Sequence, residues 1–167
     1  MTTVSEIMTR GVRAMAPHDS VVQAAQAMDE LNVGVVPVCD GETLIGMVTD
    51  RDITVRGVAQ GRASEQTRLS DIMSPEVHWC SEDQDIEDVL RDMSQHQVRR
   101  LPVVDREKHL VGMVTIGDIA AKTGHSEVGD SLGDISEPAQ PDRSGNSAAS
   151  GSAGGGSASG SASRMPG

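Results

Sequence analysis

The sequence predicts an α+β fold in which two similar units, each with the element order β-α-β-β-α, pack with pseudo-two-fold symmetry. Three observations lead to this expectation. The chain repeats itself once in the same order of features, and each copy combines one helical stripe with two short apolar runs. In addition, a unit of about 55 residues buries too little apolar surface to be stable alone, so the two should share a core.

The repeat is visible by direct alignment of the chain with itself. A shift of 65 residues aligns VSEIMTRGV (4–12) with LSDIMSPEV (69–77), and VVPVCD (35–40) with RLPVVD (100–105). One extra residue in the second copy raises the shift to 66, and GMVTDRDI (46–53) then matches GMVTIGDI (112–119). Because the order of shared features never changes, we interpret the chain as an internal duplication.

A helix is expected early in each copy. Ser20 suits the N-cap position, and Gln23 stands where a capping box needs its polar partner. Helical spacing then gives a buried stripe made of Val21, Ala24, Ala25, Met28 and Leu31. In the second copy Asp85 is the expected cap, and the stripe consists of Ile86, Val89, Leu90 and Met93. Each copy therefore predicts one amphipathic helix.

Strands are expected on both sides of this helix. In the first copy a short strand is expected at 12–15, and a hairpin of strands at 33–38 and 44–48. The hairpin turns at Asp40-Gly41, a pair that tolerates the positive φ of a tight turn. The second copy turns through residues 105–108 instead. A further helix should begin at Thr49 or Asp50 and carry Ile53 and Val55.

Composition restricts the class of partner and compartment. The formal net charge is −11, which argues against duplex nucleic acid as a partner. Glu6 interrupts the N-terminal stretch where a signal peptide needs an apolar run, and no segment is long and apolar enough for a membrane span. Cys39 and Cys80 lack the spacing of a C-x-x-C motif. We therefore expect a cytoplasmic protein without a membrane partner.

The chain divides into two folded units and a tail. Residues 1–62 and 63–125 are the expected domains. An acidic segment with two prolines follows, and from about Ser144 the sequence is almost entirely Gly, Ser and Ala. Such a composition cannot offset the entropy lost on ordering, so residues 126–167 are expected to be a flexible tail.

The repeated motifs resemble those of the CBS-domain family, and the two copies together resemble a tandem CBS pair. The likeness rests on VSEIMT and LSDIMS, on VVPVCD and RLPVVD, and above all on the two GMVT-x-x-DI segments. It covers nearly all of residues 1–122, and the chain is most similar to stand-alone bacterial CBS-pair proteins, including the hypoxic-response type. The resemblance implies a regulatory module, commonly a homodimer, that binds AMP, ADP, ATP or S-adenosylmethionine between its halves and requires no cofactor.

Two Thr-x-x-Asp pairs are the first candidate site residues, Thr49 with Asp52 and Thr115 with Asp118. A carboxylate can accept hydrogen bonds from both ribose hydroxyls, and a helix start suits a phosphate. The resemblance implies these roles, Asp for ribose and Thr for phosphate. The alternative is that each pair only caps its helix and complements the helix dipole. Capping and binding are compatible.

The remaining candidates lie around the predicted strands. Arg99 and Arg100 precede a strand where members of the family often contact phosphate, and Gly34 and Val35 occupy the same place in the first copy. Two different sites are therefore expected. One would favour phosphorylated ligands, and the other would take a neutral adenosyl group or remain empty, although Arg51 of the first copy could partly compensate for the missing arginines. The resemblance implies that the first strands line the adenine pocket, which adds Val12, Val77 and Trp79, whose indole would stack on a purine or fill the pocket and exclude one. For each, packing or solvent exposure is the alternative.

The sequence offers little support for an enzyme or a metalloprotein. Nucleophile, base and orienting group do not occur together in a known motif. The five histidines, at positions 18, 78, 96, 109 and 125, show no spacing such as H-x-x-x-H. We therefore expect no catalytic or metal residues, with a zinc site pooled from Cys39, His78 or similar residues as the alternative. The output is expected to pass to an unknown effector protein. The alternatives are a ligand-free interaction scaffold and a redox- or metal-responsive stress protein acting through Cys39 and Cys80.

Overall fold

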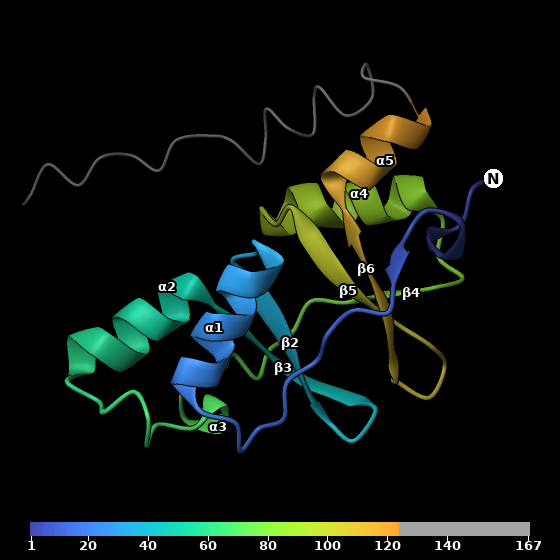
Figure 1. Ribbon diagram of the computed structural model, residues 1–167. Coiled ribbons are helices and arrows are strands. Elements are labelled where there is room, and N and C mark those ends of the chain that lie inside the picture. Colours follow the sequence, from blue (N-terminus) through green and yellow to red (C-terminus); the bar gives the residue numbers. More distant parts are fainter. Residues whose placement is uncertain (124–167) are drawn as a thin grey trace, which may run out of the picture. The chain divides into compact units, whose positions relative to one another are not determined.

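The computed structural model describes residues 1–123, and the predicted acidic segment and tail at 126–167 lie outside them. Figure 1 shows the described chain as two groups of helices and strands. The first contains α1 (Val21–Leu31), β2 (Val35–Asp40), β3 (Thr43–Thr49), α2 (Asp50–Asp52) and α3 (Leu69–Ile72). The second contains β4 (Cys80–Ser81), α4 (Ile86–His96), β5 (Arg100–Val104), β6 (Leu110–Thr115) and α5 (Ile116–Thr123).

Helix α1 begins where the sequence predicts it. The Ser20 hydroxyl accepts the backbone N–H of Gln23 at 3.2 Å, and the Gln23 side chain accepts the N–H of Ser20 at 2.8 Å. The predicted stripe is only partly correct, because Ala27 is buried in place of Ala25. The buried face is rotated toward Ala27, which leaves Ala25 exposed. Leu31 ends the helix and is 46% exposed.

Helix α4 agrees with its predicted cap and stripe. The Asp85 carboxylate accepts the N–H of Glu87 at 2.9 Å, and all four expected apolar side chains are buried, namely Ile86, Val89, Leu90 and Met93. The predicted helix after Thr49 starts correctly but is irregular. It consists of α2, a π-helical turn at Ile53–Gly57 and a 3₁₀ turn at Val58–Gln60. Among the described residues, no helix has the length and apolar character that a membrane crossing requires.

The strands of residues 1–123 form two sheets. Strands β2 and β3 pair as the predicted hairpin, with Gly41 at a positive φ of 61° in the turn. The second sheet has the order β1-β6-β5-β4, in which β1 (Thr9–Arg10) runs antiparallel to β6 and β4 runs parallel to β5. The prediction of a strand at 12–15 is wrong in its bounds. In that stretch only Met15 pairs, through an isolated parallel bridge to Val38, while β1 at Thr9–Arg10 belongs to the other sheet.

The first segment of each copy packs in the core of the other half. Val4 and Met8 are buried in a cluster with Val89, Met93 and other residues of the second half. Leu69 and Ile72 are buried with Val36 and other residues of the first half. Figure 1 shows the N-terminal strand β1 beside β6 accordingly. Each half therefore needs a segment that the repeat assigns to its partner.

The two hairpins also contact each other directly. The Leu44 N–H donates to the Lys108 carbonyl at 3.2 Å, and the Leu110 N–H donates to the Glu42 carbonyl at 2.9 Å. Cys39, Leu44 and Val104 form a buried cluster at this contact. Strand β3 begins and strand β5 ends near this contact, and the opposite ends of both strands border the candidate site.

Candidate functional site

A pocket of about 480 Å³ is lined by residues of both halves. This volume lies within the range of about 300–1,000 Å³ that is usual for small-molecule sites. The first half contributes the residues at the start of β2 and the end of β3, Gly34, Val35, Met47, Thr49, Asp50 and Arg51. The second half contributes the residues before β4 and around the start of β5, Glu76, Val77, His78, Val98, Arg99, Arg100, Leu101 and Pro102.

The pocket combines an apolar wall with charged groups. Side chains such as Val77 and Leu101 supply the wall. Three arginines, Arg51, Arg99 and Arg100, line it together with two carboxylates, Asp50 and Glu76. An apolar wall suits a purine ring, and guanidinium groups form strong, charge-assisted hydrogen bonds to phosphate. The pocket thus offers both kinds of contact that a phosphorylated nucleoside requires.

Thr49 lines the pocket, whereas Asp52 is occupied by the helix cap. The Thr49 N–H donates to Asp52 Oδ2 at 2.9 Å, and the Asp52 N–H donates to Thr49 Oγ1 at 3.0 Å. Asp52 Oδ1 lies 3.7 Å from Arg56 Nε, and the Asp52 side chain is only 14% exposed. The pair therefore makes the capping arrangement that the sequence offered as the alternative, and Asp50 takes a place in the pocket lining that sequence reasoning did not assign.

The second pair, Thr115 and Asp118, repeats this arrangement. Asp118 Oδ2 accepts both the N–H and the hydroxyl of Thr115 at 2.8 Å, and Thr115 Oγ1 accepts the N–H of Asp118 at 3.2 Å. Neither residue belongs to the lining of the 480 Å³ pocket. The two Thr-x-x-Asp pairs are thus alike in local structure but do not face this pocket together.

One expectation about the arginines is wrong for this pocket. Arg99 and Arg100 were expected in one site, and Gly34 and Val35 in another, because the two pairs occupy equivalent places in the repeat. The structure instead brings both pairs to the same pocket. The reason is that the starts of β2 and β5 both border the contact between the halves, so that equivalent positions face one another there.

Among the expected adenine-pocket residues, Val77 lines the pocket, whereas Val12 and Trp79 do not. Trp79 is 45% exposed, and Lys108 Nζ lies 6.0 Å from the centre of its ring, within cation–π range. His78 is a lining residue that sequence reasoning missed. Its ring contacts that of His96 at the end of α4, with 4.1 Å between the ring centres.

The chain's relatives identify the fold. The sequence pattern of the CBS domain matches residues 4–56 and again residues 69–123. The chain belongs to the CBS-domain family. It is a CBS pair, as the repeat predicts. YhcV of Bacillus subtilis, a CBS domain-containing protein, is 42% identical over 137 residues, or 81% of this chain and 96% of YhcV. Hypoxic response protein 1 of Mycobacterium tuberculosis is 39% identical over 121 residues, or 72% of this chain and 84% of the relative.

Solved CBS structures agree with this assignment. Hypoxic Response Protein I, with two coordinated zinc ions, matches with a TM-score of 0.67 and 37% identity over 73% of this chain and 99% of its own. CBSX2 in complex with AMP has a TM-score of 0.63 and 28% identity, covering 72% and 94% of the two chains. The CBS pair of MJ0100, with 5-methylthioadenosine and S-adenosyl-L-methionine, has a TM-score of 0.64 and 28% identity, covering 74% and 96%.

The two cysteines of the CBS pair are buried, with Cys39 5% and Cys80 1% exposed. Burial raises the pKa of the Cys39 thiol; burial, together with the charge of Asp92, raises the pKa of Cys80 to about 12. Because the thiolate is the reactive form, we expect iodoacetamide to modify neither cysteine in the folded protein, and both in guanidinium. Mass spectrometry of the labelled chain measures this. Rapid modification of either thiol in the native protein would contradict it and favour the redox alternative.

Proposed function

We propose that this CBS pair is a non-catalytic regulator that binds a phosphorylated adenosine ligand in the 480 Å³ pocket. The single observation that carries the proposal is the composition of the lining, in which an apolar wall stands beside arginines from both halves. The AMP bound to CBSX2 and the S-adenosyl-L-methionine bound to MJ0100 support adenosine ligands for a CBS pair. AMP, ADP and ATP are the ligands that the three arginines favour.

Within this proposal the predicted residues have separate roles. Arg51, Arg99 and Arg100 bind the phosphate, and Val77 packs on the base. The cap uses Asp52 Oδ2 and Thr49 Oγ1. We assign Asp52 Oδ1 to a ribose hydroxyl, a contact that would replace its ion pair with Arg56 Nε at 3.7 Å. Thr115 and Asp118 would play the same parts toward a second ligand.

The regulatory output follows from the position of the pocket between the halves. A ligand shifts a conformational equilibrium only by its differential affinity for the two states. Ligand contacts at the ends of β3 and β5 favour one packing of the two hairpins, which meet through Leu44, Lys108 and Leu110. We propose that an effector protein, or a second copy of the chain, recognises the hairpin packing that the ligand favours.

Titration calorimetry with AMP, ADP, ATP, S-adenosylmethionine and adenosine tests the proposal. At least one phosphorylated nucleotide should bind, and more tightly than adenosine. Trp79, the only tryptophan, lies two residues from the pocket-lining Val77, so its emission should change with occupancy. A ligand that binds only the folded state must also raise the melting temperature. Silent calorimetry together with an unchanged melting temperature would reject the nucleotide sensor and leave the interaction scaffold.

A further inference from the structure

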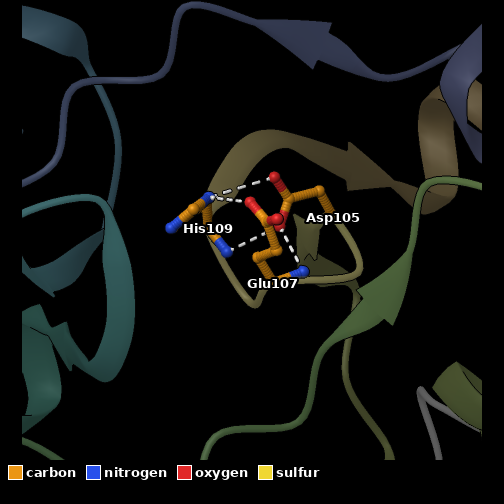
Figure 2. A group of neighbouring side chains, drawn as sticks. All are labelled: Asp105, Glu107 and His109. Atoms are coloured by element: carbon orange, nitrogen blue, oxygen red, sulfur yellow. Dashed lines mark hydrogen bonds and ion pairs between the residues drawn. The ribbon is translucent and has the colours of Figure 1, made fainter.

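The turn between β5 and β6 brings two carboxylates and an imidazole to one point. One ligand atom each of Asp105, Glu107 and His109 lie within 4.8 Å of one another. Figure 2 shows one ring nitrogen of His109 turned toward both carboxylates and the other turned away from them. We propose that these three side chains bind a divalent transition metal ion of the Zn²⁺ type, independently of the nucleotide pocket.

The distances match the edges of a metal coordination sphere. His109 Nδ1 lies 3.2 Å from Asp105 Oδ2 and 3.5 Å from Glu107 Oε2. In a tetrahedral zinc site with bonds of about 2.0–2.1 Å, neighbouring ligand atoms are about 3.3–3.4 Å apart. Two edges of such a site are therefore present, and the carboxylate oxygens of Asp105 and Glu107 lie within 4.8 Å of each other. Glu107 is the most exposed of the three and so the side chain with the most freedom to adjust.

The Asp105 carboxylate is already held in place for such a role. Its Oδ1 accepts the backbone N–H groups of Glu107 and His109, each at 2.9 Å, so that Oδ2 is presented to the imidazole. Hydrogen bonds that fix an inner ligand in this way are a regular feature of metal sites.

The charges of the turn also favour a cation. Its two basic side chains are directed to other groups, since Arg106 contacts Asp83 at 3.2 Å and Lys108 lies over Trp79. Two carboxylates therefore face an imidazole that is neutral when it acts as a ligand. A dication offsets this charge, and the imidazole nitrogen selects a transition metal over Mg²⁺ or Ca²⁺, which prefer oxygen ligands.

An ion in this turn would act on the contact between the two halves. The Lys108 carbonyl, between two of the ligands, accepts the N–H of Leu44, and residue 109 forms a β-bridge with Thr43 of the first hairpin. Fixing the turn should thus stabilise the pairing of the hairpins. The bound metal should therefore raise the melting temperature of the whole CBS pair.

Calorimetry and thermal melts of the metal-free full chain with ZnCl₂ test the site. We expect one Zn²⁺ per chain at this turn and a higher melting temperature, with no such rise from MgCl₂ at the same concentration. Glu107→Gln should weaken binding at least about tenfold, and His109→Gln should abolish it. His18→Gln, at an exposed histidine of the first half, is the matched control and should leave binding unchanged.

The substitutions also separate loss of the site from loss of the fold. The Glu107 side chain is 78% exposed, so Glu107→Gln should keep the wild-type melting temperature without metal. Nitrogen resonances of the His109 ring should show Zn²⁺ on Nδ1. No binding of Zn²⁺, or binding that survives both Glu107→Gln and His109→Gln, would overturn the proposal. Equal binding of Mg²⁺ would overturn its assignment to a transition metal.

Discussion

Replacing Leu69 with Ala is expected to lower the free energy of unfolding by about 2–5 kcal/mol, which is the usual cost of removing a fully buried leucine side chain. Leu69 is 0% exposed and lies in a core cluster with Val36, Val48 and other residues of the first half. The repeat, however, assigns Leu69 to the second copy. Urea denaturation, with a lower midpoint and an unchanged slope, measures the loss.

The half of the protein that Leu69→Ala destabilises shows whether Leu69 packs in the first half or within its own copy of the repeat. Hydrogen exchange in Leu69→Ala should increase first in β2 and β3, which the side chain supports, and less in β5 and β6. Leu31→Ala makes the same chemical change at a side chain that is 46% exposed, and it should alter stability by less than about 0.5 kcal/mol. Faster exchange confined to the second sheet would show that Leu69 stabilises its own repeat.

The elements of the CBS pair could be predicted where local rules determine them. Ser20 and Asp85 are caps because of their own side chains, and the stripe of α4 follows from its period. The exchange of segments could not be predicted in this way. Alignment of VSEIMT with LSDIMS shows that Val4 and Leu69 are equivalent, but it does not show which core each of them joins.

The candidate site was predictable in part for a similar reason. Thr49, Arg51, Val77, Arg99 and Arg100 all border predicted strand ends, and the structure gathers them in one pocket. That Gly34 faces the same pocket depends on the packing of the two halves, which no single copy specifies. The Asp105–Glu107–His109 cluster does not follow from the spacing of the histidines, and the sequence signal that marks it is D-x-E-x-H at one predicted turn.

The second large effect is expected on ligand binding. Arg100→Gln should weaken the binding of AMP, ADP or ATP by about 10- to 150-fold, which corresponds to the loss of one charge-assisted hydrogen bond of about 1.5–3 kcal/mol. Arg100 lines the pocket at the first position of β5. The change in nucleotide affinity should be measured by calorimetry at one fixed salt concentration, because dissolved ions screen exposed charges.

The comparison of nucleotide with adenosine shows whether Arg100 acts on the phosphate. Adenosine has no phosphate, so its affinity should change less than about twofold in Arg100→Gln. The ratio of the AMP affinity to the adenosine affinity should therefore fall by nearly the same factor as the AMP affinity itself. Arg91→Gln is the matched control, since Arg91 pairs with Asp88 on α4 at 2.8 Å and does not line the pocket. If Arg100→Gln weakened adenosine and AMP equally, the guanidinium would be shaping the pocket rather than binding phosphate, and the anion would have to be bound by Arg51 or Arg99.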